Sequence, residues 1–266
     1  MSAKTEWIER RGLEAMHQAC PNLTRAGIGL ALHDIDGVAV SVCARSTSIL
    51  LNRVMGLGER GPATEMTLSR IKKIYANAGV DRYFVHVCPD SEPKDKIRNL
   101  LSDAGFENYR GWMKFTRDKT PADPAPTDLT VRKIDQGNAD DFAHICGAGF
   151  GMEGEATPLL AALVDHPNWH IFMSFDGNTP AGTGGLYVED GIAKCDFGAT
   201  DPVFRQRGSQ SAVLVARINA ARQMGAELIV TETGEAVEGD PQHSYNNILK
   251  RGFKEAYLRE NWVLSK

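Results

Sequence analysis

The sequence lacks the features that would mark a membrane, secreted or nucleic-acid-binding protein. No apolar run approaches the roughly 18–20 residues of a membrane-spanning helix. The opening stretch MSAKTEWIERRGLEAMHQAC carries charges where a secretory signal needs an apolar segment. Positive charge is not in excess, because 30 Lys and Arg stand against 34 Asp and Glu, a net charge of −4. These absences predict a cytosolic protein that binds neither a membrane nor nucleic acid.

Cysteine is scarce, and no C-x-x-C spacing occurs. The five cysteines lie far apart, which is typical of buried reduced thiols and leaves a single catalytic cysteine as the alternative. They are Cys20, Cys43, Cys88, Cys146 and Cys195. The closest approach to metal-ligand spacing is His166 and His170, but Pro167 argues against a helix that would place both on one face. We therefore predict no metal site.

Proline is infrequent except in one segment, RDKTPADPAPTDLT at residues 117–130, which holds three of the twelve prolines and few apolar residues. Such a stretch is stiff and solvated, and it is typical of a linker. We predict a domain over residues 1–118, a linker over 119–128 and a second domain over 129–266.

The second domain has the pattern of an α+β fold, in which helices cover a central mixed sheet. Asp190-Gly191 predicts a hairpin turn. Apolar residues Leu214, Ile218 and Ala221 follow a helical period, and Gly225 suits a helix end. The expected strands cover residues 130–134, 169–175, 181–189, 192–200, 227–232 and 254–264. One expected helix begins near residue 139, and the others cover residues 157–166, 209–223 and 244–251.

The first domain repeats the later part of this plan from about residue 27. A strand pair around Asp36-Gly37 precedes a helix, a strand, a helix and a final strand, expected at 64–79, 82–87, 96–105 and 108–117. Gly61 and Gly105 are 44 residues apart, as are Gly208 and Gly252. A constant offset of 147 residues therefore relates the two parts, which indicates an internal duplication.

The stretch FGATDPVFRQRGSQSAVLVAR is the most informative for function. A strand ends near Ala199 and Thr200, and the loop that follows leads through Gly208 into a helix. The first N–H groups of a helix have no partner within it, and with the helix dipole they form a site for a phosphate group. Gly208 allows a close approach of the backbone, and Arg205 and Arg207 can add charge-assisted hydrogen bonds.

This stretch, with the following AELIVTE, NNILKRGF and final strand, resembles the Gcn5-related N-acetyltransferase (GNAT) superfamily, whose acetyl-CoA loop reads Q/R-x-x-G-x-G/A. The resemblance covers the second domain and, in degenerate form, the first, as in tandem-domain members. It implies two GNAT-like acyl-CoA N-acyltransferase domains, acetyl-CoA as co-substrate, and direct transfer of acetyl to a primary amine of a small molecule. A homodimer is compatible with the sequence.

The resemblance also implies the residues that bind acetyl-CoA. Gln210 departs from the family's Gly or Ala, and Asn247 lies where members often contact the cofactor, although a helix-surface amide is the alternative. The backbone at Ala199 and Thr200 would pair with the pantetheine arm and polarise the thioester carbonyl. The implied set is Ala199, Thr200, Arg205, Arg207, Gly208, Ser209, Gln210, Ser211, Ala212 and Asn247.

The catalytic residues are less readable. Ile248 stands where the family's general-acid tyrosine is expected, so Tyr245, nearly one helical turn away, is the substitute. Asp196 and Glu232 are the candidate bases, each with a structural ion pair as the alternative. The glycine-containing loop GAGFGMEGEATP, residues 147–158, is expected to line the acceptor site.

Two other functions compete. The missing tyrosine favours a binding or sensory module that holds acyl-CoA without turnover. The stretch GLGERG at residues 56–61 matches a dinucleotide fingerprint, but the offset of 147 lays it over the acetyl-CoA loop. There it lacks the leading arginine, and Pro62 removes one N–H donor. We predict that the first copy binds no CoA.

Overall fold

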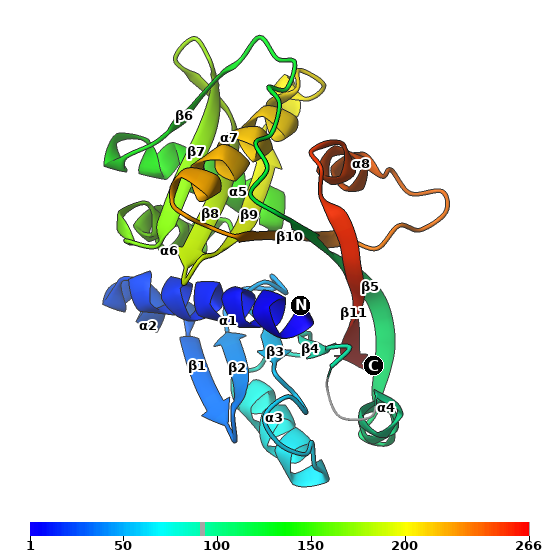
Figure 1. Ribbon diagram of the computed structural model, residues 1–266. Coiled ribbons are helices and arrows are strands. Elements are labelled where there is room, and N and C mark those ends of the chain that lie inside the picture. The colour runs from blue at the N-terminus through cyan, green and yellow to red at the C-terminus, as the bar shows by residue number, and fades with distance from the viewer. Residues whose placement is uncertain (91–93, 266) are drawn as a thin grey trace.

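The computed structural model describes residues 1–90 and 94–265, which form one eleven-stranded mixed sheet with helices packed against it (Figure 1). The strand order is β1-β2-β3-β4-β11-β5-β10-β9-β8-β7-β6. The sheet is continuous through both halves of the chain.

The N-terminal copy comprises residues 2–117. Thr64 starts α3, since its hydroxyl accepts a hydrogen bond from the N–H of Thr67, and all six residues of the apolar strand β2 are buried. The elements are α1 (Ser2–Ala19), α2 (Asn22–Ile28), β1 (Leu30–Ile35), β2 (Val38–Cys43), β3 (Arg53–Met55), α3 (Glu65–Asn77), β4 (Phe84–Val87), α4 (Lys94–Asp103) and β5 (Phe106–Arg117).

The C-terminal copy comprises residues 130–264. Its elements are β6 (Thr130–Lys133), α5 (Ala139–Phe150), α6 (Thr157–Ala161), β7 (Trp169–Asp176), β8 (Thr179–Glu189), β9 (Ile192–Thr200), α7 (Ser209–Gln223), β10 (Leu228–Gly234), α8 (His243–Lys250) and β11 (Lys254–Leu264). Short 3₁₀ turns surround α5 and α6 and precede α7.

From α1 to β5 and from α5 to β11, both copies run helix, helix, three strands, helix, strand, helix, strand. In each copy, one strand pairs antiparallel with the strand before it and parallel with the strand after it. In the N-terminal copy this strand is β3, between β2 and β4, and in the C-terminal copy it is β9, between β8 and β10. The last strands are exchanged: β11 pairs with β4, and β5 pairs with β10. The two exchanged strands also pair with each other at the centre of the sheet.

The strands and helices expected from the sequence are confirmed, with α6 shorter than expected and continued by a 3₁₀ turn. Three elements were not expected: α1, α2 and the short strand β3. The repeat therefore begins at residue 2 rather than near residue 27. The division at residues 119–128 remains a prediction. That segment has no helix or strand, but the exchanged strands place part of each copy within the sheet of the other.

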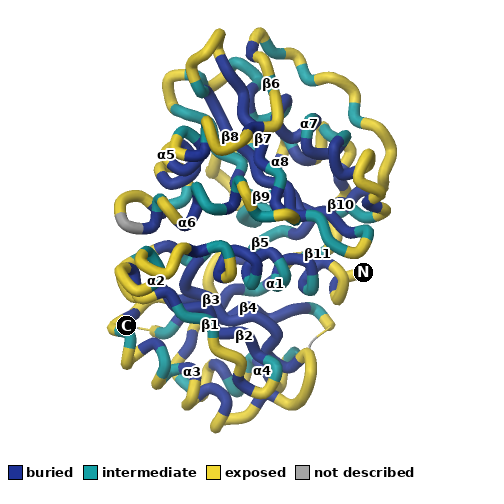
Figure 2. Tube along the Cα trace, turned by 90° about the vertical axis from the view of Figure 1, so that its left-hand side faces the viewer, coloured by how far each residue is buried: buried dark blue, intermediate teal, exposed yellow. Residues whose placement is uncertain are grey.

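Helix α1 lies between the two copies (Figures 1 and 2). Its apolar residues Ile8, Leu13 and Met16 belong to a core that also holds residues of α5 and β7, such as Phe142 and Met173. The copies thus share a core as well as a sheet. No helix in the described ranges is long and apolar enough to cross a membrane. All five cysteines are free and buried, as expected.

Candidate active site

The candidate site lies where β9 and β10 separate. These parallel strands pair only at their beginnings, from Ile192 with Leu228 to Lys194 with Val230. Beyond this point β9 is irregular, because the pairs Thr183–Ala199 and Gly185–Asp196 leave one extra residue on β9, a β-bulge. The separated strands open into a pocket of about 490 Å³, a size that suits a small molecule.

The bulge lies at Phe197 and Gly198, where Phe197 has a φ of 53°, unusual for a residue with a side chain. Arg217 of α7 holds this backbone in place. Its Nη1 donates to the carbonyl oxygens of Asp196 at 2.8 Å and Gly185 at 3.1 Å. Gly184 leaves room for the guanidinium, since a Cβ there would lie 2.7 Å from it. The bulge is therefore fixed from α7.

The N-terminal copy forms one wall of this pocket. The loop of residues 47–50, which precedes β3, lines it together with Arg82, which precedes β4, and Trp112 of β5. Phe150 and the glycines on either side of it, at the end of α5, continue this wall, since Ser48 Oγ donates to the Phe150 carbonyl oxygen at 2.9 Å. The loop predicted to line the acceptor site does so through its first part. The pocket is shared between the copies, which the sequence analysis did not anticipate.

Gln210 and Asn247, two of the predicted cofactor residues, meet in the pocket. The Asn247 side-chain amide donates to Gln210 Oε1 at 2.7 Å, and Gln210 Nε2 donates to Ser244 Oγ at 2.8 Å. These bonds connect α7 with α8 beside the separated strands. Asn247 thus lies on the surface of α8 that faces the pocket, and its side chain holds Gln210 in place.

The loop before α7 has the backbone of a close-approach site. Gly208, the N-cap, has a φ of 82° and supplies no side-chain cap, and Gln206 also has a positive φ of 65°. The linker crosses this loop: a Cβ on Gly208 would overlap the carbonyl oxygen of Pro126, and Thr127 Oγ1 donates to the Arg207 carbonyl at 2.7 Å. Only glycine fits at position 208.

The two loop arginines differ. Arg207 is held by Asp128 and Asp176, with its Nη1 at 2.7 Å from the Asp176 carboxylate. Its charge is therefore largely offset within the chain. Arg205 is exposed, and within the described ranges no ion pair holds it. Of the two, Arg205 is the one free to meet a phosphate group.

The other predicted cofactor residues surround the start of α7. Ser209 is buried, and its Oγ lies 2.8 Å from Ser174 Oγ and accepts from Thr200 Oγ1 at 3.4 Å. Its side chain therefore anchors the helix, which leaves only its backbone for a ligand. Ser211 is half-buried and Ala212 is buried. Ala199 and Thr200 lie beyond the pocket lining, which on β9 runs from Cys195 to Gly198.

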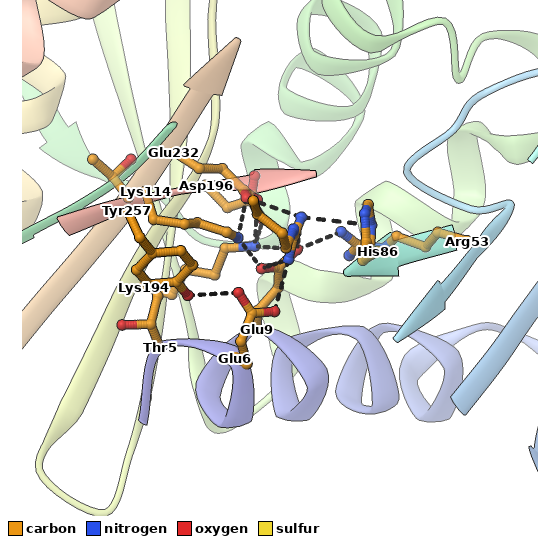
Figure 3. Close-up of polar contacts among 12 residues, drawn as sticks. Thr5, Glu6, Glu9, Arg53, His86, Lys114, Lys194, Asp196, Glu232 and Tyr257 are labelled. Atoms are coloured by element: carbon orange, nitrogen blue, oxygen red, sulfur yellow. Dashed lines mark hydrogen bonds and ion pairs between the residues drawn. The ribbon is translucent and has the colours of Figure 1, made fainter. Parts of the chain in front are cut away.

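Asp196 of β9 lines the pocket and lies at the edge of a group of charged side chains (Figure 3). Its Oδ2 lies 2.8 Å from Lys194 Nζ, and its Oδ1 accepts from the Phe197 N–H at 2.8 Å. The carboxylate is 16% exposed, so it reaches the cavity while keeping these two partners. This is the geometry of an oriented carboxylate at the point where the strands open.

Glu232 also lines the pocket, but buried cations hold it (Figure 3). It forms ion pairs with Lys114, with Lys194 at 3.1 Å and with Arg259 at 3.3 Å. Burial and the neighbouring Glu9 act to raise the pKa of Glu232, but the three cations outweigh both and lower it to about 2. Such a carboxylate is a weak proton acceptor at neutral pH.

Glu232 and Asp196 belong to a buried charge cluster of four carboxylates and four cations, contributed by α1 and five strands. Its members are Glu6, Glu9, Arg53, Lys114, Lys194, Asp196, Glu232 and Arg259. Glu9 lies at its centre: its Oε1 is 2.7 Å from Arg53 Nη1, and its Oε2 is 2.6 Å from Arg259 Nη1. The charges balance, which is what makes such burial tolerable.

Tyr245 is separated from the pocket. Its hydroxyl donates to Glu255 Oε1 at 2.5 Å, and its ring packs edge-on against Phe115. Burial and Glu255 raise the pKa of Tyr245 to about 12. Its neighbours Ser244, Asn247 and Ile248 line the pocket instead. The geometry gives Tyr245 no contact with the place where a thiolate would leave.

One group of three metal-ligating side chains lies close together in the described ranges: Glu6, Glu59 and Cys88, with ligand atoms within 4.8 Å of one another. Glu6 is already engaged, since it accepts from the Tyr257 hydroxyl at 2.5 Å and from Arg259 at 2.9 Å. Burial, with Glu6 and Glu59 nearby, raises the pKa of Cys88 well above its ordinary value, so it remains a thiol. Glu6 thus belongs to the buried charge cluster, and a protonated thiol is a poor metal ligand.

Several site residues had no readable signal in the sequence. Glu6 and Glu9 are charged residues in a helix, a pattern that ordinarily indicates a solvent-facing surface. Arg82 and Trp112 reach the site only because the copies share a sheet. Gly198 was readable, since a glycine within a strand often marks a bulge.

Comparisons with known proteins give the fold. No family model matches the sequence, and no curated protein matches it. A GCN5-related N-acetyltransferase from Kribbella flavida is similar over 98% of this chain and 95% of its own, with 13% identity and a TM-score of 0.66. A putative GNAT-family acetyltransferase from Novosphingobium aromaticivorans is similar over 94% and 99%, with 11% identity and a TM-score of 0.55.

A tandem GNAT protein from the clavulanic acid biosynthesis pathway is similar over 74% of this chain and 67% of its own, with 12% identity and a TM-score of 0.53. At these identities the likeness concerns the fold. The chain has the fold of the GCN5-related N-acetyltransferases, in two copies that share one sheet.

Proposed function

We propose that the protein is an N-acetyltransferase that moves an acetyl group from acetyl-CoA to a primary amine of a small molecule. The observation that carries the proposal is the gap between β9 and β10, which opens into the pocket beside the glycine loop of α7. The pyrophosphate of acetyl-CoA would meet the first N–H groups of α7 and Arg205. The pantetheine arm would follow β9 toward the bulge at Phe197 and Gly198.

In the proposed reaction the amine nitrogen attacks the thioester carbonyl carbon, and the carbon–sulfur bond then breaks to release the CoA thiolate. The amine gives up one proton and the thiolate takes one, so the transfer balances. The backbone N–H of Gly198 at the bulge would stabilise the negative charge on the carbonyl oxygen, since the Phe197 N–H is taken up by Asp196 Oδ1. Asp196 is the candidate base, because it is oriented and reaches the pocket. The pKa of Glu232, about 2, makes Glu232 the weaker choice.

A module that binds acyl-CoA without turnover is the second candidate. The hydroxyl of Tyr245 is turned toward Glu255, which leaves no tyrosine in the pocket lining to protonate the leaving thiolate. Arg207 is also held by two aspartates rather than free for a phosphate group. On this alternative the pocket would hold the acyl chain as a ligand.

Two measurements separate the candidates. Calorimetry with CoA tests binding, and release of free thiol from acetyl-CoA, followed with a chromogenic disulfide, tests transfer to amines, polyamines and amino acids. The transferase is expected to bind CoA and to release thiol only with an acceptor. Tight binding without thiol release on any acceptor would favour the binding module, and no CoA binding would contradict both.

The Asp196→Asn variant tests the base. We expect kcat to fall by about 10²–10⁴-fold with little change in CoA affinity. Asp190→Asn is the matched control, because Asp190 is exposed at the β8–β9 hairpin, away from the pocket. A kcat for Asp196→Asn within threefold of the parent would remove Asp196 from the proposed mechanism.

A further inference from the structure

Two guanidinium groups in the pocket have no counter-ion. Arg82 makes one described contact, over the ring of Tyr109 at 5.7 Å. Arg217 is fully buried and bonds only to the carbonyl oxygens of Val213, Gly185 and Asp196. Among the described side chains, which are those of residues 1–90 and 94–265 without Glu155, no carboxylate forms an ion pair with either group.

The carboxylates of the pocket cannot supply the missing charge. Asp196 and Glu232 are each bound by cations of the buried charge cluster. Because that cluster balances its own four positive and four negative charges, Arg82 and Arg217 leave the pocket with an excess of two positive charges. Arg82 is exposed, so its charge is solvated in the free protein and is available to a ligand of opposite sign that enters the pocket.

The phosphates of CoA are poorly placed to supply the negative charge that these arginines lack. The pyrophosphate would sit at the first turn of α7, whereas the Arg217 guanidinium is already bound by the carbonyl oxygens of Val213, Gly185 and Asp196. Arg82 belongs to the N-terminal copy and lines the pocket from there. The thioester end of the cofactor, which would reach this region, is uncharged.

The wall around Arg82 has the character of a site for a small acid. Ile49 and Leu50, which line the same pocket, are apolar and half-buried, and Trp112 and Phe150 add aromatic surface. An arginine binds a carboxylate through two parallel hydrogen bonds, which fixes the orientation of the ligand. The pocket that holds Asp196 thus also offers a carboxylate anchor and an apolar surface.

We propose that the acceptor is an amino acid, an amine that also carries a carboxylate, and that Arg82 of the N-terminal copy binds this carboxylate. The inference rests on the proposed transferase function. It gives the N-terminal copy a direct part in substrate recognition: this copy holds the acceptor, and the C-terminal copy holds acetyl-CoA.

The test compares acids with their own amides. Phenylalanine, leucine, β-alanine and 4-aminobutyrate, each beside its carboxamide, serve as acceptors for thiol release and as ligands of the CoA-saturated protein in calorimetry. We expect kcat/KM, and binding, to favour at least one acid over its amide by tenfold or more. If every amide equals its acid in both measurements, the inference is overturned.

Arg82→Gln assigns the effect to its residue. This variant is expected to raise KM for the preferred acid at least tenfold. KM for the corresponding amide and the affinity for CoA should stay unchanged. Arg82→Lys should restore part of the lost KM. Arg222→Gln, on the exposed end of α7, is the control. An unchanged KM for the acid in Arg82→Gln would overturn the assignment.

The two hypotheses fail in distinguishable ways. If the protein binds CoA and an acid in an Arg82-dependent way but releases no thiol, Arg82 is a carboxylate-binding residue of a non-catalytic site, and both the transferase proposal and the acid's role as acceptor are contradicted. If it releases thiol equally with acids and amides, the transferase proposal stands and the acceptor inference is contradicted.

Discussion

The loops that precede α3 and α7 occupy the same place in the two copies. They differ in whether a side chain accepts a hydrogen bond from the first N–H groups of the helix. In the N-terminal copy, Thr64 caps α3 and takes up the N–H of Thr67. In the C-terminal copy, the cap is Gly208, which has no side chain and leaves the helix start to the backbone. A helix start of the second kind is the one that can receive a phosphate group.

The same contrast extends to the side chains. At the offset of 147 residues, the polar set Gln210, Ser244 and Asn247 corresponds to Ala63, Ile97 and Leu100. Ala63 and Ile97 are buried in the apolar core of the N-terminal copy, and Leu100 packs against it. Where the C-terminal copy keeps a hydrogen-bonded pocket, the N-terminal copy has filled the space. The comparison supports the proposal that only the C-terminal copy binds the cofactor.

The largest effect is expected where the copies are joined. Replacing Glu9 by Gln removes the carboxylate that meets Arg53, Lys114 and Arg259, and leaves buried cations uncompensated. The free energy of unfolding should fall by about 3–5 kcal/mol, measured by urea denaturation. Glu14→Gln, on the same helix but in half-exposed pairs, should cost at most about 1 kcal/mol. Equal effects would show that the cluster does not couple the copies.

Acid should weaken the same junction. The pKa of Glu232 is about 2 when folded and near 4.5 ordinarily, and the cations around Glu9 lower its pKa as well. A depressed pKa stabilises the fold above pH 4.5, and this contribution is lost as the pH falls toward 2. Urea midpoints between pH 6 and 2.5 should show the loss. Glu232→Gln should flatten the dependence, whereas the exposed Glu238→Gln should leave it unchanged.

A matched pair of glycines tests the two loops. Gly208→Ala places a Cβ against Pro126 at a φ of 82°, so we expect CoA affinity to fall at least tenfold and stability to fall by about 1–3 kcal/mol. Gly61→Ala meets nothing within 4 Å and has no positive φ, so both quantities should stay as in the parent. A loss of CoA binding in Gly61→Ala would mean that the N-terminal loop binds the cofactor.

The polar set can be converted to its apolar counterpart. Gln210→Ala and Asn247→Leu introduce the residues of the N-terminal copy, and each should weaken CoA binding by about three- to tenfold, because both side chains depend on the same hydrogen bond. In the double variant the two effects should be smaller than their sum, since residues in contact are not additive. The exposed neighbour Asn246→Leu is the control. Full additivity would indicate that the two amides act independently.

The smallest effect is expected at the cap of α3. Thr64→Gly frees the N–H of Thr67 and should cost only a few tenths of a kcal/mol in thermal unfolding. It should not create a second CoA site, because the apolar residues around Ala63 still fill the space. A second equivalent of bound CoA in calorimetry would show that the cap alone had silenced the first copy.

Sequence reasoning reached the parts of this molecule that depend on neighbours along the chain. The helix over residues 209–223 followed from Leu214, Ile218 and Gly225, and its loop followed from Gly208. It did not reach the exchange of β5 and β11, because strand pairing is decided by distant residues. Nor could it predict the burial of Glu6 and Glu9, whose charges are tolerable only beside cations from other strands.

The exchange of β5 and β11 also restricts the order in which the sheet can assemble during folding. Until β11, at residues 254–264, has left the ribosome, β4 lacks its neighbour on one side and remains an open strand edge. The N-terminal copy, although synthesised first, therefore cannot complete its own sheet until the C-terminal copy has been synthesised, unlike a domain that folds as soon as it emerges. The wall that carries Arg82 is finished only when the last strand of the C-terminal copy arrives, so neither half of the chain can be assembled ahead of the other.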